Sequence, residues 1–232
     1  MTLLVGTSGF AYPKWKPSFY PAGLPAKQFL RYYGEHFRSV EINNTFYRLP
    51  TASALEAWAA DVPADFRFVL KAPQLITHIR RLKDVAEPVA EFVKVAAVLK
   101  ERLGPLLFQL PPNLKKDMER LTGLLALLPA GVRLAFEFRH PSWFDAEVYT
   151  LLRDRSAALC IADADDDLEV PFEPTAGWGY LRLRRETYTP MAMKKWVAKV
   201  KEQAWADTFV FFKHEDTGTG PKFAKQFLKL AE

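Results

Sequence analysis

Eight short apolar segments alternate with seven helical segments along this 232-residue chain, and the alternation predicts an α/β fold, a TIM-type (β/α)8 barrel. Polar side chains lie near the ends of several apolar segments, where parallel barrels house their sites. No GxGxxG or Walker motif follows the first strand, as the rival open doubly wound sheet would usually have. We therefore expect one barrel domain over residues 1–232.

Each predicted strand is a short apolar run, and helical patterns lie between the runs. The predicted strands are Leu3–Thr7, Ser39–Asn43, Phe66–Lys71, Leu106–Leu110, Arg133–Phe138, Ala157–Ile161, Tyr180–Leu183 and Thr208–Phe212. The predicted helices are Ala26–Glu35, Ser53–Ala60, Pro88–Arg102, Asp117–Leu128, Ala146–Asp154, Met191–Gln203 and Pro221–Leu230. The connection between strands six and seven, Asp163–Gly179, lacks a clear helix.

Composition limits the classes of function. The net charge of +5 and the pI near 9.2 permit an anionic partner, but the charge is not concentrated in one run. The single cysteine, Cys160, excludes an internal disulfide and suits a reducing cytosol. No apolar run reaches the roughly 18 residues of a membrane span, and no signal-peptide pattern opens the chain. We expect a cytoplasmic protein with no membrane partner.

Side-chain alternation predicts which residues face the barrel axis. In the fifth strand, Leu134, Phe136 and Phe138 share the face that helices cover, so Glu137 and Arg139 point inward. The same rule turns these polar residues inward: Glu41, Asn43, Arg67, Lys71, Gln109, Arg182 and Arg184. They predict a polar site at the C-terminal mouth. The alternative is a set of closed structural ion pairs, Glu137 with Arg182 or Glu41 with Lys71.

The predicted site supplies groups for binding and catalysis. Glu137 and Glu41 form an acid–base pair in this interpretation, and Lys71 and Arg182 tune their pKa or hold negative charge. The substrate-binding candidates are Trp15, Tyr12, Asn43, Tyr47, His78, Gln109, Arg139, His140, Arg184, Lys213 and His214. The first loop, SGFAYPKWKPSFYP, interleaves aromatic rings with lysines, which suits stacking on a sugar or base. A hydrophobic lid over the barrel is the alternative.

The segment KHEDTGTGPKF follows the last strand and suggests a second anion site. Gly218, Thr219 and Gly220 feed a helix N-terminus, where backbone N–H groups can face an anion. Ordinary helix capping is the alternative. We predict no cofactor, because no HxH or HExxH spacing is present. A divalent metal held by histidines and carboxylates of the mouth is the alternative.

Several motifs in order resemble the YecE-like family, domain of unknown function 72. They are GTSGFAYPKW, VEINNTFYR, FRFVLKAP followed by TH, LGPLLFQLPP, FEFRHPSW and FFKHED. The resemblance covers the chain from about Val5 to the final helix and implies a TIM-type barrel, with no activity attached. The positions that carry it are Gly6, Thr7, Ser8, Gly9, Trp15, Glu41, Asn43, Tyr47, Lys71, Thr77, His78, Gln109, Glu137, Arg139 and Arg182.

Two departures from the family pattern make the predicted mouth more basic. Many members read Arg-Leu-His-Gly where this chain has Arg182-Leu183-Arg184-Arg185, and many carry an Asn pair at Lys213-His214. Both favour an anionic ligand. We expect a barrel that binds a small phosphorylated or sugar-like anion, with hydrolase or isomerase chemistry. The alternatives are a barrel that binds nucleic acid or processes it with a metal, and a non-catalytic ligand sensor or scaffold.

Overall fold

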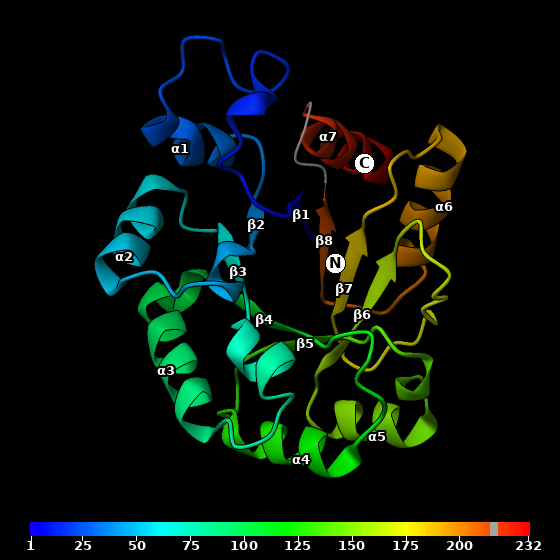
Figure 1. Cartoon of the computed structure of the whole chain (residues 1–232). Coiled ribbons are helices and arrows are strands. Elements are labelled where there is room, and N and C mark those ends of the chain that lie inside the picture. The colour runs from blue at the N-terminus through cyan, green and yellow to red at the C-terminus, as the bar shows by residue number, and fades with distance from the viewer. Residues whose placement is uncertain (214–217) are drawn as a thin grey trace.

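A computed structural model describes residues 1–213 and 218–232, and in it eight parallel strands form a nearly closed barrel inside a ring of helices (Figure 1). The strand order around the barrel is β1-β8-β7-β6-β5-β4-β3-β2. The strands are β1 (Thr2–Thr7), β2 (Ser39–Ile42), β3 (Arg67–Lys71), β4 (Leu103–Gln109), β5 (Leu134–Glu137), β6 (Ala158–Asp163), β7 (Gly179–Leu183) and β8 (Asp207–Phe212). The predicted fold class is confirmed.

Helices connect the strands and cover the outside of the barrel. The α-helices are α1 (Phe29–Gly34), α2 (Ala52–Asp61), α3 (Ala86–Ala96), α4 (Met118–Leu127), α5 (Ala146–Asp154), α6 (Pro190–Lys201) and α7 (Thr219–Ala231). Short 3-10 helices are η1 (Pro13–Trp15), η2 (Ala26–Gln28), η3 (Asn44–Phe46), η5 (Ala97–Arg102) and η6 (Pro141–Trp143), and η4 (Leu75–Ile79) is a π-helix. Side-chain oxygens of Thr51, Asp117 and Thr189 cap α2, α4 and α6.

The main differences from the predicted elements have local causes. β4 begins at Leu103 rather than Leu106. The predicted helix Pro88–Arg102 is formed by α3 followed by the 3-10 helix η5, and Lys100 within η5 leaves the helical region at φ 49° and ψ −128°. Residues 164–178, all of them described, contain no helix, which confirms the prediction for the connection between β6 and β7.

Buried side chains separate into two groups, one on each face of the sheet. The outer group lies between strands and helices, and Phe108, Phe136 and Phe138 belong to it. The inner group fills the lower barrel and consists of Leu4, Val69, Leu107, Ala135, Ala158, Cys160, Trp178, Tyr180, Phe209 and Phe211. This division confirms the predicted alternation. The apolar inner group forms a floor beneath the polar residues at the C-terminal ends of the strands.

The barrel closes between β1 and β2 with little strand pairing. The described contact is one parallel bridge, Ser8 to Glu41. The Tyr33 hydroxyl of α1 supplements it: it accepts a hydrogen bond from Thr7 N at 2.8 Å and donates to Ser39 O at 3.0 Å. Gly6 allows the two strands to approach, since a Cβ there would lie 1.9 Å from Ser39 O. A helix residue therefore joins the two strands where the ladder is weakest.

We predict that Gly6→Ala destabilises the barrel, because its methyl group would collide with the backbone of Ser39. The expected loss in the free energy of unfolding is at least about 1–3 kcal/mol, measured by urea denaturation. Gly123→Ala in α4 is the matched control, because a Cβ at that position would meet no neighbouring part of the fold within 4 Å and alanine favours a helix. Equal stability of the two variants would contradict this account of the closure.

Candidate functional site

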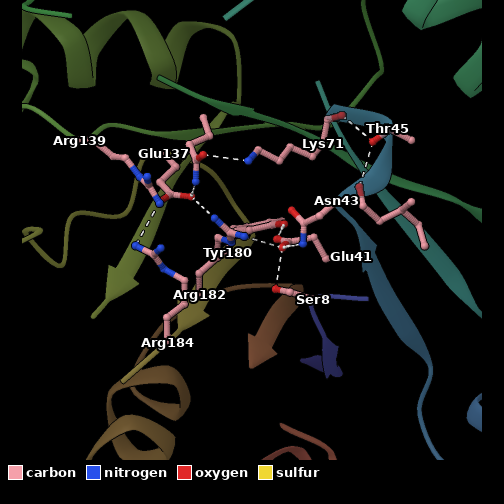
Figure 2. A network of polar contacts seen from close by, with 12 residues as sticks. Ser8, Glu41, Asn43, Thr45, Lys71, Glu137, Arg139, Tyr180, Arg182 and Arg184 are labelled. Atoms are coloured by element: carbon pink, nitrogen blue, oxygen red, sulfur yellow. Dashed lines mark hydrogen bonds and ion pairs between the residues drawn. The ribbon is translucent and has the colours of Figure 1, made fainter. Parts of the chain in front are cut away.

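A layer of polar side chains crosses the barrel at the C-terminal ends of the strands, with Arg182 at its centre (Figure 2). Arg182 reaches from β7 to carboxylates on two other strands. Its Nη2 lies 2.8 Å from Glu41 Oε1 of β2, and its Nη1 donates to Glu137 Oε2 of β5. All three residues are buried. The guanidinium therefore bridges the barrel interior through two charge-assisted hydrogen bonds.

Glu41 is surrounded by donors from β7 and from the residues that directly follow β1 and β2. Ser8 Oγ donates to its Oε1 at 2.7 Å, and Asn43 Nδ2 donates to the same oxygen at 3.1 Å. The Tyr180 hydroxyl donates to Oε2 at 2.5 Å. Together with Arg182, these contacts occupy both carboxylate oxygens. Glu41 therefore acts as a fixed anion at the point where the barrel closes.

Glu137 is equally well supplied with donors. Gln109 lies level with Glu137 in the β4–β5 register, and its Nε2 donates to Oε2 at 2.9 Å. Arg139 Nε donates to Oε1 at 3.1 Å, and Arg184 Nη2 lies 3.4 Å from that oxygen. Three guanidinium groups therefore meet one carboxylate. The predicted pair of Glu137 with Arg182 is found, and Glu41 pairs with Arg182 rather than with Lys71.

Lys71 lies at the end of β3 and contacts an amide and an aromatic ring. Its Nζ donates to Gln109 Oε1 at 2.8 Å and lies 4.0 Å from the centre of the Phe46 ring. Thr45 holds the adjoining loop, because its hydroxyl contacts Lys71 O at 2.6 Å. His78 packs edge-on against the same Phe46 ring, with ring centres 4.8 Å apart. Lys71 and His78 thus both contact one aromatic side chain.

The surroundings keep both carboxylates ionised. Burial by itself raises the pKa of Glu137, but Arg182, followed by Arg184 and Arg139, outweighs it and holds that pKa well below its ordinary value. Burial opposes the ionised form of Glu41 in the same way, and Arg182 with Tyr180 holds its pKa below the ordinary value. Neither carboxylate carries a proton near neutral pH. The two ionised carboxylates are therefore better suited to holding the neighbouring arginine side chains in position than to donating a proton.

Two basic side chains at the mouth lose their protons more easily than usual. Burial, followed by the charge of Arg182, lowers the pKa of Lys71 from its ordinary 10.5 to about 8. Burial, followed by the charge of Lys71, lowers the pKa of His78 from its ordinary 6.5 to about 4. The His78 ring is therefore neutral at pH 7. A fraction of Lys71 is neutral there as well.

A cavity of about 420 Å³ opens beside Glu137. Arg139 and Arg184 line it together with Asp166 and Asp167 of the β6–β7 connection. A second cavity of about 130 Å³ lies between the loops after β1 and β2, lined by residues that include Tyr12 and Asn43. The polar layer therefore borders open space on two sides of the mouth.

The predicted aromatic binding residues differ in their surroundings. Trp15 is completely buried, with its ring centre 4.9 Å from that of Tyr12 and stacked on Tyr20 at 5.9 Å. This packing favours the hydrophobic-lid alternative for the first loop. Tyr12 borders the smaller cavity, and its hydroxyl donates to Ser8 O at 3.0 Å. Tyr47 is 74% exposed, on the loop after η3.

The remaining predicted residues lie away from the central layer. His140 is the N-cap of η6, and its Nδ1 accepts a hydrogen bond from Ser142 N at 3.2 Å. Lys213 is exposed after β8, and His214 lies outside the described residues. Gly218, Thr219 and Gly220 begin α7 beside a separate cavity of about 420 Å³, with Lys222 and Lys225 in its wall. That anion loop stays a prediction.

Four side chains of the layer were not among the proposed site residues, and the first is Ser8, which donates to Glu41. Tyr180 contacts Glu41, while Phe46 and Thr45 position Lys71. Alternation in YLRLR could have identified Tyr180, because it lies two positions before Arg182 and shares its face. No local signal marks Phe46, since its contact with Lys71 depends on how the β2 loop folds over β3.

A family model described as "Protein of unknown function DUF72" matches residues 4–232. The chain belongs to this family. Among curated relatives, UPF0759 protein YecE of Escherichia coli K12 is 31% identical over 143 residues, which cover 61% of this chain and 50% of YecE. That match thus spans about half the length of YecE. UPF0759 protein YunF of Bacillus subtilis 168 is 30% identical, with 93% of this chain and 90% of YunF covered.

Solved DUF72 structures have the same fold. A DUF72 family protein from Thermotoga maritima MSB8 matches with a TM-score of 0.85 and 29% identity, over 99% of both chains. A DUF72 family protein from Enterococcus faecalis V583 matches with a TM-score of 0.81 at 19% identity, over 99% of this chain and 95% of the other. The second similarity concerns the fold alone.

Residues 1–213 and 218–232 contain neither a membrane-spanning helix nor a clustered metal site. None of the helices there has the length and apolar character needed to cross a membrane. No group of three or more His, Cys, Asp or Glu side chains in the same part of the chain is arranged to hold a metal ion.

We predict that Glu137→Gln destabilises the protein, because Arg182 loses one of its two buried partners. The expected loss is about 3–5 kcal/mol at neutral pH, measured by urea unfolding. The lowered pKa of Glu137 stabilises the fold above the ordinary carboxyl pKa, and this stability is lost as pH falls through the folded pKa. The variant should therefore lose less stability on acidification than the parent protein.

Asp65→Asn is the matched control for Glu137→Gln, since it removes a carboxylate from an exposed ion pair with Arg38. Its expected cost is below about 1 kcal/mol. A similarly small cost for Glu137→Gln would show that the buried bridge contributes little to stability.

Proposed function

We propose that the barrel binds a small anionic ligand, phosphorylated or sugar-like, at its C-terminal mouth, with Arg139 and Arg184 holding the anionic group. One observation carries the proposal. Arg184 Nε is buried and has no hydrogen-bond partner among the described residues, although Arg184 lines the 420 Å³ cavity. Buried guanidinium donors are normally satisfied. A phosphate or carboxylate in this cavity would accept hydrogen bonds from Arg184 and from its neighbour Arg139.

The charge balance of the inner layer supports an anion. The cationic side chains of Lys71, Arg139, Arg182 and Arg184 outnumber the carboxylates of the layer. Glu41 and Glu137 already receive several donors each. Two of these cations, Arg139 and Arg184, line the 420 Å³ cavity together with Glu137. Because Asp166 and Asp167 also line this cavity, the anionic part of the ligand would lie toward Arg139 and Arg184.

The sugar-like part of the proposal rests on Asn43. Its Nδ2 donates to Glu41, whereas its Oδ1 is buried without a hydrogen-bond partner among the described residues. Asn43 also borders the smaller cavity. A ligand hydroxyl would satisfy this acceptor. A ligand that places an anionic group at Arg139 and Arg184 and a hydroxyl group at Asn43 would be a small polar metabolite.

The chemistry of the mouth remains a proposal. Acid–base catalysis by Glu137 and Glu41 is still a prediction, and their lowered pKa values favour a positioning role for both. Lys71 is the group of the layer whose pKa of about 8 suits proton exchange near neutral pH. Hydrolase or isomerase activity stays a prediction. Nucleic-acid binding stays an alternative, and a steep loss of affinity with salt would reveal it.

We predict that Arg184→Gln and Arg139→Gln each weaken binding of ribose 5-phosphate and of inorganic phosphate. Each variant loses charge-assisted hydrogen bonds worth about 1.5–3 kcal/mol, which is roughly a 10- to 100-fold increase in Kd. Isothermal titration calorimetry at fixed ionic strength measures the Kd. Thermal shift with the same two compounds gives an independent readout.

Arg38→Gln is the matched control, because Arg38 lines the cavity at the opposite end of the barrel. It makes the same change in net charge and should leave the Kd unchanged. If all three variants weaken binding equally, the effect is a general electrostatic one and the proposed site is wrong. Absence of binding by the parent protein to every phosphorylated compound tested would also overturn the proposal.

A further inference from the structure

The buried amine of Lys71 has no carboxylate partner among residues 1–213 and 218–232. Glu41 and Glu137 pair with arginines instead. The contacts of Nζ are an amide oxygen at 2.8 Å and the face of Phe46 at 4.0 Å, and 9% of the residue is exposed. A buried ammonium group is usually paired with a carboxylate. The amide oxygen and the aromatic ring compensate the positive charge of Lys71 only in part.

The orientation of Gln109 explains this arrangement. Its Nε2 donates to the ionised Glu137 at 2.9 Å, so its Oε1 faces Lys71. The amide of Gln109 therefore lies between Glu137 and the amine of Lys71, and the amine contacts a neutral oxygen in place of a carboxylate. Burial and the charge of Arg182 then lower the pKa of Lys71 to about 8. At pH 7 about a tenth of such amines are neutral and nucleophilic.

A second basic side chain, that of His78, contacts the same aromatic ring. The π-helix η4 carries His78, whose ring packs edge-on against Phe46. Single π-helical turns are frequent at functional sites. His78 Nδ1 lies 2.8 Å from Thr77 Oγ1, which holds the ring in place. The ring is neutral at pH 7 because burial and the charge of Lys71 lower its pKa to about 4.

We propose that Lys71 forms an imine with the carbonyl group of an anionic oxo compound, a keto acid or a phosphorylated aldehyde or ketone. This inference rests on the anion site proposed above, since Arg139 and Arg184 hold the anionic end. A lysine buried beside cationic groups is a known route to such a nucleophile. The chemistry extends the proposed function from binding to covalent catalysis.

The step balances without an oxidant or reductant. The lone pair of neutral Lys71 Nζ attacks the carbonyl carbon, a C–N bond forms, and the carbonyl oxygen takes a proton to give a carbinolamine. The nitrogen then loses one proton, which neutral His78 can accept through water, and the hydroxyl group takes up a proton from the solvent and leaves as water, so that a protonated imine forms. The C=N bond is complete, and one water is released for each imine formed.

Reductive trapping on the parent protein tests the proposal. Pyruvate and dihydroxyacetone phosphate are each incubated with the protein and cyanoborohydride, and the adduct is located by peptide mapping. We expect one dominant adduct, on Lys71, with a rate of trapping that rises as the pH passes through about 8. Mapping on the parent protein keeps the test independent of variant folding. Labelling spread over surface lysines without enrichment at Lys71 would overturn the proposal.

Variants sharpen the result. Lys71→Arg should lose the adduct, whereas Lys199→Arg, which alters a lysine on α6, should retain it. The double change of Arg139 and Arg184 to Gln should lower the trapping rate at least tenfold. If phosphate binds and Lys71 is not trapped, this inference fails and the anion site stands. If Lys71 is trapped and phosphate does not bind, or acetone traps it as fast as pyruvate, the anion site fails.

Discussion

A single buried guanidinium, that of Arg182, neutralises two carboxylates that the fold has brought into the barrel interior. Ionised Glu41 and Glu137 lie on β2 and β5, and each would be expensive to bury without a partner. Arg182 has a planar set of donors that reaches both. The remaining members of the layer are arranged around this bridge. Ser8, Tyr180, Gln109 and Arg139 satisfy the lone pairs that the guanidinium leaves open.

This bridge makes the mouth asymmetric. On the β5–β7 side, Glu137 is ionised and held in place, because three arginines meet its carboxylate there. On the β3 side, Gln109 gives the amine of Lys71 a neutral acceptor, and burial, followed by the charge of Arg182, lowers the pKa of that amine. One side of the mouth is therefore suited to holding an anion. The other side carries a group able to exchange protons or to attack a carbonyl carbon.

The apolar floor of the barrel gives these groups fixed positions. Phe209, Phe211 and Tyr180 pack beneath the polar layer, and Tyr180 also contacts Glu41 through its hydroxyl. Tyr33 joins β1 to β2 at the opening of the sheet. Because the residues of the central bridge, Glu41, Glu137 and Arg182, stand on strands, small changes in the core are transmitted to their geometry. Stability of the barrel and geometry of the mouth are thus closely linked.

Local pattern by itself determined the eight strands and the side chains that face the axis, because alternation has a period of two and is written in neighbouring residues. It correctly placed Glu41, Lys71, Gln109, Glu137 and Arg182 inside the barrel. The partners of these residues depend on strand register, which is a property of residues far apart in the chain. Glu41 is level with Val69, so Lys71 lies one inward position nearer the mouth and reaches Gln109.

The burial of Trp15 and the contact of Phe46 with Lys71 were likewise decided by tertiary packing. An aromatic residue in a loop has the same local sequence pattern whether its ring stacks on a ligand or on other rings. In this protein Trp15 packs against Tyr12 and Tyr20, and Phe46 covers the amine of Lys71. Sequence thus determined which groups enter the mouth. Only the three-dimensional structure decided which charges neutralise one another and which amine is left beside a neutral acceptor.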